Sequence, residues 1–177
     1  SIPWPRGKVL GGSSSINGLL YVRGQAEDFD GWRQLGNAGW GWDDVLPFFK
    51  RSESWEDGED EMRGGDGPLS VSKTRLSREV VDKWLDAAVN AGYKRNPDYN
   101  GADQEGVGYF QLTAKDGKRC SSAVAYLKPA RGRKNLKIFT NAPAELLLFD
   151  GNRATGIITR KNGVLLALKA RHEIVLS

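Results

Sequence analysis

"PRGKVLGGSSSINGLLYVRGQAEDFDGW" occupies residues 5–32 and carries more information about the fold than any other stretch of this sequence. Adjacent glycines at positions 11 and 12 permit positive φ angles and a close approach of the backbone to a flat or phosphorylated ligand. The serines at 13–15 add hydroxyl and N–H donors, so the loop is suited to hold an anion or a polar ring. It is not a P-loop, because Lys8 precedes the paired glycines, and its spacing differs from the three-glycine dinucleotide fingerprint.

The composition narrows the class of protein. A chain of 177 residues with 39% hydrophobic side chains can bury a core, which indicates one compact domain or part of a larger one. Its 26 Lys and Arg residues against 22 Asp and Glu residues give a net charge of +4, too small an excess to indicate nucleic-acid binding. The basic stretch "KPARGRKNLK", residues 128–137, is more typical of a solvated connection than of a nucleic-acid-binding surface. We therefore expect no nucleic acid as a partner.

Cysteine and histidine are each present once, which limits the possible metal and redox chemistry. Cys120 alone can form neither an internal disulfide nor a four-cysteine zinc site, and His172 alone excludes a centre with several histidines. No stretch approaches the roughly 18 apolar residues of a membrane span. We expect no metal site, no membrane span and a reducing, cytoplasmic compartment.

Two segments have the apolar spacing and the end signals of helices. The clearer one runs from about Arg78 to Ala91, with Ser77 as its N-cap, an apolar face turned toward the core and Gly92 in the stop position. Residues 42–53 also predict a short helix, because two aspartates stand near its start.

The remaining segments are short and are separated by turn signals. We expect a third helix to begin at Ser121 or Ser122 and to end before Pro129. The charged, glycine-rich stretch 53–67 is typical of a loop. The turns "DGN" and "KNG" separate apolar runs near the C-terminus and favour hairpins. We expect strands at residues 69–72, 109–113, 136–140, 146–150, 155–160, 164–169 and 173–176.

The complete spacing of the motif at residues 5–32 resembles that of a known protein family. Residues 7–17, Gly-Lys-Val-Leu-Gly-Gly-Ser-Ser-Ser-Ile-Asn, are followed by Tyr21, Gly24 and Asp30. This pattern resembles the first signature of the glucose-methanol-choline (GMC) oxidoreductases, which are FAD-dependent enzymes that oxidise alcohols. "RGGDGPLSV" (63–71), "GKRCSSAVAYL" (117–127) and "FTNAPAELLLFDGNRATGI" (139–157) resemble later landmarks in the same order, and most closely those of the choline dehydrogenase branch.

The resemblance implies a set of FAD contacts. It assigns the flavin to Val9, Gly12, Ser13, Asn17, Gly18, Leu19 and Leu20, and the adenine ring to Pro143. Proline has no N–H group, so only the Pro143 carbonyl could take part. Two alternatives stay open, namely that Asn17 caps a turn and that Pro143 bends an edge strand. Ile16 takes the position of a histidine that bonds covalently to the flavin in some members, so the implied attachment of FAD is non-covalent.

The resemblance also implies an incomplete FAD-binding fold of the α+β class, with α/β flavin-binding elements and part of an antiparallel substrate-domain sheet. Residues 1–30 and 132–177 would belong to the flavin-binding domain, and residues 31–131 to the substrate or cap domain. The family's dinucleotide fingerprint lies upstream of this motif and its catalytic histidine far downstream. We therefore expect an internal fragment without a catalytic residue, inactive without the remaining segments of its parent chain.

The implied reaction transfers a hydride from the carbon of a small-molecule alcohol to flavin N5. A rival hypothesis is a stand-alone anion-binding or interaction module, in which the glycine-serine motif holds an anion and the strand-rich C-terminal part is a scaffold. The tryptophans at 32, 40 and 42 suggest an aromatic cage for a cationic substrate, but a role in packing is the better interpretation.

Overall fold

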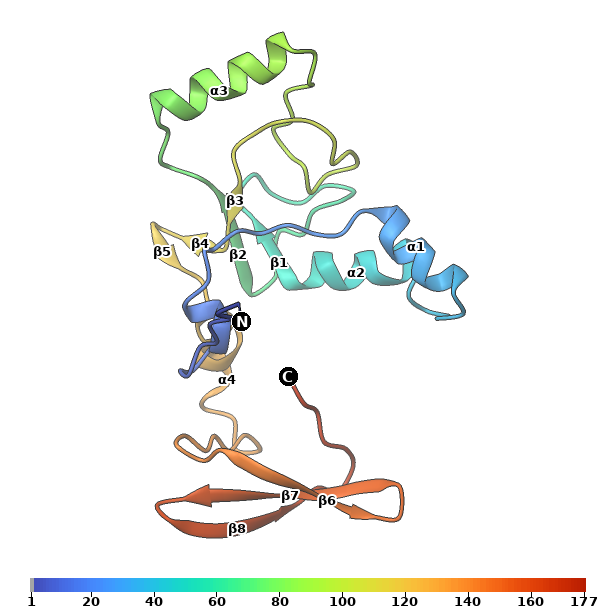
Figure 1. Cartoon of the computed structure of the whole chain (residues 1–177), viewed down its shortest axis with the longest axis vertical. Coiled ribbons are helices and arrows are strands. Elements are labelled where there is room, and N and C mark those ends of the chain that lie inside the picture. The colour runs from blue at the N-terminus through green and yellow to red at the C-terminus, as the bar shows by residue number, and fades with distance from the viewer. Residues whose placement is uncertain (1) are drawn as a thin grey trace. The chain divides into compact units, whose positions relative to one another are not determined.

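The computed structural model describes residues 2–177, which form two compact units. The first unit ends at Gly132, and the second comprises Arg133–Ser177. Figure 1 shows helices and short strands in the first unit and a strand-only second unit. The expected α+β class is confirmed, since helices occur together with mainly antiparallel strand pairs.

A three-stranded sheet lies at the centre of the first unit. Strand β1 (Glu53–Trp55) runs parallel to β2 (Leu69–Lys73), and β2 pairs antiparallel with β3 (Gln111–Leu112). The hairpin of β4 (Ala114–Lys115) and β5 (Lys118–Arg119) follows directly. The prediction of a loop over 53–67 is wrong at its start, because β1 is a strand whose Glu-Ser-Trp sequence has no apolar alternation. The expected strand 109–113 forms only over two residues.

Helix α2 (Trp42–Ser52) leads directly into β1, and α1 (Ala26–Gln34) and an aromatic cluster pack against α2 (Figure 1). Helix α1 was not predicted, although Asp28 accepts a hydrogen bond from the Gln25 N–H group, as a capping residue does. Helix α2 confirms the prediction for residues 42–53. Phe29 lies 5.7 Å from Trp42 and 5.3 Å from Trp32, measured between ring centroids. These contacts give the tryptophans the packing role that the sequence favours.

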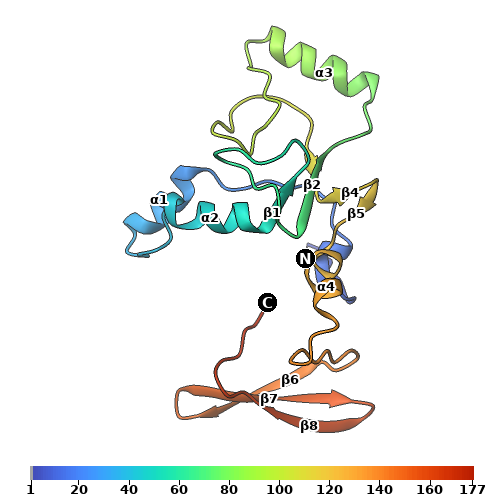
Figure 2. The same cartoon turned by 180° about the vertical axis from the view of Figure 1, so that it is seen from behind.

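Helix α3 (Glu79–Asn90) also confirms its prediction, and Gly92 follows it with a φ of 99°. Two details are wrong. The N-cap is Arg78 rather than Ser77, and the apolar face is largely exposed, since Val80 and Trp84 have 72% and 62% of their surface accessible and only Leu85 is buried. Figures 1 and 2 show α3 at the end of the unit, away from the strands.

A helical segment continues past Pro129, where we expected it to stop. A π-helical turn (η2, Ala123–Leu127) leads directly into α4 (Lys128–Ala130), which contains this proline. Pro129 stands in the first turn of α4, where the missing N–H group and the fixed φ of a proline are tolerated.

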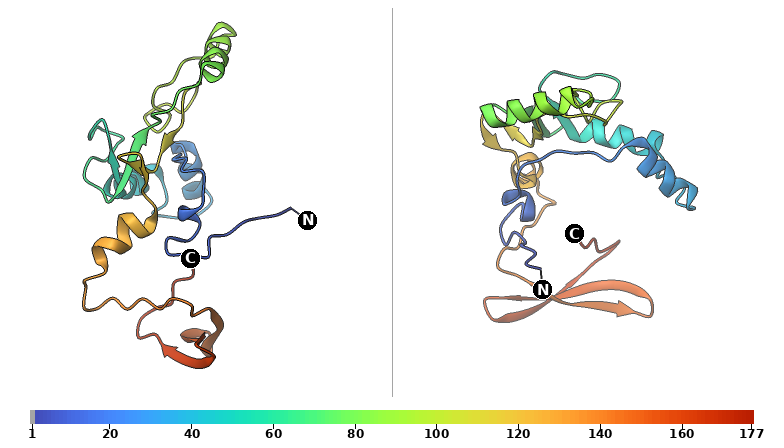
Figure 3. Two further views of the ribbon diagram at one scale, coloured as in Figure 1. Left: turned by 90° about the vertical axis from the view of Figure 1, so that its left-hand side faces the viewer. Right: turned by 45° about the horizontal axis from the view of Figure 1, so that its top comes forward.

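The second unit is an antiparallel meander of β6 (Ala144–Asp150), β7 (Arg153–Lys161) and β8 (Val164–Lys169), strongly twisted in Figure 3. Both predicted hairpin turns are confirmed, with positive φ angles at Gly151, Asn162 and Gly163. The expected strands 136–140 and 173–176 are wrong. Within the described residues these segments have no strand partner.

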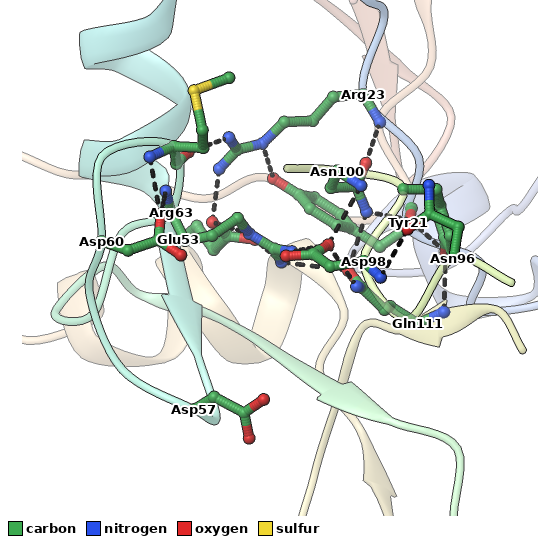
Figure 4. Close-up of polar contacts among 12 residues, drawn as sticks. Tyr21, Arg23, Glu53, Asp57, Asp60, Arg63, Asn96, Asp98, Asn100 and Gln111 are labelled. Carbon is green, nitrogen blue, oxygen red and sulfur yellow. Dashed lines mark hydrogen bonds and ion pairs between the residues drawn. The ribbon is translucent and has the colours of Figure 1, made fainter. Parts of the chain in front are cut away.

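The centre of the first unit is charged rather than apolar. The Glu53 carboxylate is fully buried and binds the guanidinium groups of both Arg23 and Arg63. Arg63 approaches it as a fork, with Nε 3.1 Å from Oε2 and the second nitrogen 2.6 Å from Oε1. The Gly64 N–H group also donates to Oε2. This arrangement joins β1 to the loop before β2 and to the extended segment that contains Arg23 (Figure 4).

Neutral polar side chains extend this charged cluster to β3. The side-chain amide of Gln111 donates to Asp98 at 2.7 Å and its oxygen accepts from Arg63 and from Asn100. Asn100 in turn accepts a 2.7 Å hydrogen bond from the Arg23 N–H group. Within residues 2–177, no buried side-chain nitrogen or oxygen lacks a partner. The cluster of Arg23, Glu53, Arg63, Asp98, Asn100 and Gln111 is called the polar core below.

Burial changes the pKa values around the polar core. Removal from water raises the pKa of the Tyr21 and Tyr99 phenols, so both stay neutral at neutral pH. Burial by itself lowers the pKa of Arg63, but the hydrogen bond to Glu53 and the negative charges of Glu53 and Asp98 outweigh it, and the net change is upward. The guanidinium therefore remains charged in its buried position.

The apolar core is small for the length of the chain. Its buried members are Phe29, Trp55, Val71, Leu85, Ala114, Cys120 and Ala125. Large apolar side chains are exposed on each unit, among them Trp84 on α3 and Leu146 in the second unit.

We expect Glu53→Gln to destabilise the full-length protein strongly, because two buried guanidinium groups lose their shared carboxylate. Removing one partner of a buried ion pair costs about 3–5 kcal/mol. The free energy of unfolding in urea measures the effect. Glu79→Gln is the control, since it breaks an exposed pair with Lys83 and removes a charge from the first turn of α3, which together should cost less than about 1 kcal/mol. Equal midpoints for the two variants would contradict the role assigned to Glu53.

Candidate functional site

Residues 7–20, called the glycine-serine loop below, fold into one tight turn followed by an extended segment. Gly11 and Gly12 have φ angles of 91° and 53°, as the paired glycines predict, and a short 3-10 helix (η1, Gly12–Ser15) follows. The Gly12 N–H group donates to the Val9 carbonyl at 2.9 Å, and the Asn17 N–H group to the Ser13 carbonyl at 2.9 Å. The backbone of the loop therefore forms its turn by itself.

The glycines of this loop fall into two kinds. A Cβ atom at Gly7 would lie 2.2 Å from the Gly12 carbonyl oxygen, and one at Gly11 would lie 2.4 Å from Ser15 Oγ. A side chain at Gly7 would therefore clash with fixed backbone atoms, whereas Gly11 is required chiefly by its φ of 91° and by Ala123, whose Cβ atom would lie 3.1 Å away. A Cβ atom at Gly12 or Gly18 would have nothing within 4 Å, and Gly18 also lies outside the left-handed region. No contact among the described residues requires a glycine at 18, and the missing side chains leave room for another molecule.

Two unpaired backbone donors lie beside this open space. In the part of the chain that the structure describes, the N–H groups of Gly18 and Leu20 have no hydrogen-bond partner. Leu20 faces Leu112 of β3 in an antiparallel bridge, and Leu19 and Tyr21 on either side of it make the bonds to that strand. The Leu20 N–H group consequently points away from the sheet.

Leu19 between these donors has a strained backbone. Its φ of 68° is left-handed, which costs a non-glycine residue about 1–2 kcal/mol. Thr113 holds the strained residue in place, because its N–H group and its Oγ1 donate to the Leu19 carbonyl at 2.8 and 3.1 Å. Strain that the surroundings enforce in this way is typical of ligand-binding segments.

Asn17 and Arg119 meet across the loop. The Asn17 Oδ1 atom accepts hydrogen bonds from the Leu19 N–H group at 3.1 Å and from Arg119 at 2.6 Å, so the side chain does cap a turn. Arg119 also donates to the carbonyls of Asn17 and Ser14, at 2.8 and 3.0 Å. The sequence did not identify Arg119 as a site residue, although it lies within the segment 117–127 that resembles a family landmark.

Serines fix the other side of the loop to the η2 helix. Ser14 Oγ accepts from the Ser122 N–H group at 2.9 Å and lies 3.0 Å from Ser122 Oγ, while Ser122 Oγ donates to the Gly11 carbonyl. Figures 1 and 3 show η1 beside the segment that leads into α4. Segments more than 100 residues apart in sequence therefore form one structure.

The structure brings most of the expected flavin contacts together on the glycine-serine loop. Val9 and Leu20 expose 56% and 51% of their surface, and the Ser13 hydroxyl accepts a hydrogen bond from Gly7. Pro143 lies in the second unit, just before β6. Its carbonyl accepts bonds from Thr159 Oγ1 at 2.9 Å and the Arg160 N–H group at 3.3 Å. Both lone pairs are thus used within the sheet, which supports the structural alternative for Pro143.

Residues 2–177 contain neither a metal-binding cluster nor a helix that could span a membrane. No group of three or more His, Cys, Asp or Glu side chains is arranged to hold a metal ion. No helix has the length and apolar character needed to cross a membrane.

The family model described as GMC oxidoreductase matches residues 1–177. The chain therefore belongs to the GMC oxidoreductase family, and the resemblance of the first motif is confirmed.

Two proteins of known name are similar to nearly the whole of this chain. It is 47% identical to an oxygen-dependent choline dehydrogenase of Rhizobium johnstonii over 173 residues and 46% identical to one of Vibrio vulnificus over 176 residues. Each match covers 98% of this chain and 31% of the relative. The chain thus spans about a third of the length of these relatives.

Solved structures share the fold. Pyridoxine 4-oxidase from Mesorbium loti has a TM-score of 0.88 and 31% identity, with 94% of this chain and 33% of that chain covered. A formate oxidase from Aspergillus oryzae has a TM-score of 0.81 and 25% identity, covering 96% of this chain and 31% of its own. The expected incomplete α+β fold of the family is therefore confirmed.

We expect Gly11→Ala to disturb the glycine-serine loop, because the new Cβ atom combines a positive φ with tight contacts of 3.1 and 3.3 Å to the Cβ and N atoms of Ala123. The predicted loss of stability in the full-length protein is about 1–3 kcal/mol. Gly36→Ala is the matched control, since Gly36 has a φ of 99° but open space around its Cβ position. Unfolding midpoints should fall further for Gly11→Ala, and a smaller fall than in the control would show that the contact is unimportant.

Proposed function

We propose that this chain is part of a flavoenzyme that oxidises a small alcohol, and that the glycine-serine loop forms one wall of its FAD site. The observation that carries this proposal is the open space at Gly12 and Gly18 beside two unpaired backbone donors. Membership of the GMC oxidoreductase family supports it. The domain assignment of residues 1–30, 31–131 and 132–177, and a cytoplasmic location, belong to the same proposal.

The chemistry of the loop fits a flavin ring. The pyrimidine side of the ring carries carbonyl and imine acceptors, which the N–H groups of Gly18 and Leu20 can satisfy. The rest of the ring is flat and apolar, and the exposed side chains of Val9, Ile16 and Leu20 offer surface of that kind. Ser13 and Asn17 add polar atoms at the same loop. We propose Val9, Gly12, Ser13, Asn17, Gly18, Leu19 and Leu20 as the cofactor contacts, while the use of the Pro143 carbonyl within its own sheet argues against adding this residue.

When bound, FAD would accept a hydride from the alcohol carbon at its N5 atom. The residues of this chain contribute binding, orientation and exclusion of water. Backbone donors on a loop fixed by Thr113 and Arg119 need no reorganisation, and such donors stabilise negative charge that develops on a bound group. The general base that takes the hydroxyl proton is not among the residues that we assign to this chain.

The substrate class is a small alcohol, with choline as the first compound to test. Two of the relatives are named oxygen-dependent choline dehydrogenases, and their identity to this chain is 46–47%. We further propose that the chain is inactive without the remaining segments of its enzyme. The extent of exposed apolar surface supports that interpretation.

We expect Gly18→Ala in the full-length enzyme to raise the Kd for FAD about tenfold or more, because the Cβ atom occupies space that nothing else in the chain fills. A factor of ten corresponds to about 1.4 kcal/mol. The flavin-to-protein ratio and a fluorescence titration of the apoenzyme measure the effect. Gly31→Ala is the matched control, since Gly31 has equally open space but lies on α1. An unchanged flavin content in Gly18→Ala would contradict the proposed site.

A separate prediction concerns how FAD is held. Ile16 has no atom that can bond covalently to a flavin, so acid precipitation of the full-length enzyme should release all yellow cofactor into the supernatant. Absorbance at visible wavelengths in the supernatant and in the redissolved pellet measures the two fractions. Colour retained in the protein pellet would show that another residue makes a covalent bond.

A further inference from the structure

We propose that Arg119 and Thr113 are positioning residues of the FAD site, which aim the backbone N–H groups of Gly18 and Leu20 at the cofactor. This inference rests on the proposed function. Arg119 and Thr113 lie outside the glycine-serine loop. They keep the N–H donors of this exposed loop pointing in one direction.

Each positioning residue binds a carbonyl group whose peptide partner is one of the unpaired donors. Arg119 donates to the Asn17 carbonyl at 2.8 Å, and the same peptide group carries the Gly18 N–H. Thr113 donates twice to the Leu19 carbonyl, and that peptide group carries the Leu20 N–H. The peptide bonds of residues 2–177 are all trans. In a planar trans peptide the C=O and N–H bonds point in opposite directions, so fixing the carbonyl also fixes the donor.

Arg119 fixes more than one atom. Its guanidinium contacts Ser14 and Asn17 through three hydrogen bonds of 2.6–3.0 Å. The Asn17 side chain that it holds also accepts from the Leu19 N–H group, so the turn between the two donors is tied to the same cation. A planar fork of this kind restrains orientation as well as distance.

The two positioning residues have a common support. Arg119 lies on β5 opposite Ala114 of β4, and the Cys120 N–H group donates to the Thr113 carbonyl at 2.9 Å. Thr113 itself directly follows β3, whose Gln111 belongs to the polar core. The loop is therefore held by a short sheet segment that is anchored to the most buried part of the unit.

Charge distinguishes Arg119 from the arginines of the polar core. Arg23 and Arg63 each bind the Glu53 carboxylate, whereas no carboxylate in the described part of the chain pairs with Arg119. Its charge acts on carbonyl and amide oxygens instead. A cation bound to a carbonyl polarises the whole peptide group, which makes the N–H at its other end a stronger donor. The Gly18 N–H group is the donor that gains from this arrangement.

Three variants of the full-length enzyme test the inference. Arg119→Ala removes the fork and the charge, Arg119→Lys keeps the charge but loses the fork, and Thr113→Val removes only the Oγ1 hydrogen bond. Lys118→Ala is the matched control, because it removes one positive charge from the neighbouring exposed position of β5. The measurements are the Kd for FAD, the midpoint potential of the bound flavin and the thermal unfolding of the apoenzyme.

We expect Arg119→Ala to raise the Kd for FAD about tenfold or more, as the loss of hydrogen bonds from a charged donor implies. The midpoint potential should fall, because weaker donors stabilise the reduced flavin less. Arg119→Lys should give intermediate values, Thr113→Val a smaller change in the same direction, and Lys118→Ala wild-type values. If Arg119→Ala does not fold, Arg119→Lys and Thr113→Val decide the question by the same criteria.

Two results would overturn the inference. In the first, the Arg119 variants bind FAD with wild-type Kd and potential. In the second, Kd rises only in step with a loss of apoenzyme stability while the potential stays unchanged, which is the signature of a merely structural arginine. An outcome in which the wild-type enzyme binds no FAD would overturn the proposed function itself, and is distinguished by the first measurement.

Discussion

The buried carboxylate of Glu53 is the interaction on which the first unit depends. It pairs with both Arg23 and Arg63, two cations that are themselves almost completely buried, and Asp98 supplies Arg63 with a second carboxylate. Removing an unpaired charge from water costs several kcal/mol, so each buried arginine depends on a carboxylate that another segment of the chain supplies. The segments that carry them must therefore fold together, and they bring β1, the loop before β2 and the extended segment after the glycine-serine loop to one place.

The polar core also reaches the glycine-serine loop. Arg63 and Asn100 hold the side chain of Gln111 on β3, and the Gln111 carbonyl accepts a hydrogen bond from the Tyr21 N–H group. Leu20, the last residue of the loop, faces β3, and its N–H group points away from that strand. A path of hydrogen bonds thus connects the buried ion pair to the donors that we assign to the flavin. The proposed site is rigid on one side, where the chain supplies it, and open on the other.

Large apolar side chains are exposed on both units of this chain. Val80 and Trp84 on α3, and Leu146 and Phe149 on β6, are largely accessible. The curated relatives are about three times as long as the matched segment, and the solved structures of the family show a similar proportion. Exposed apolar surface of this kind is typical of a contact with other protein segments.

The sequence by itself determined the features that depend on a few neighbouring residues. The spacing of residues 7–17 identified the family, the turns "DGN" and "KNG" predicted the hairpins of β6–β8, and Gly92 marked the end of α3. Such features follow from φ preferences and short-range apolar spacing, which act within one turn of chain. Only the tertiary structure decided the strand role of Glu53–Trp55 and the contact of Arg119 with Asn17. A strand needs a neighbouring strand and a guanidinium group needs acceptors. Leu69 pairs with Glu53 from 16 residues further on, and Asn17 lies 102 residues before Arg119, so no local pattern indicates either contact.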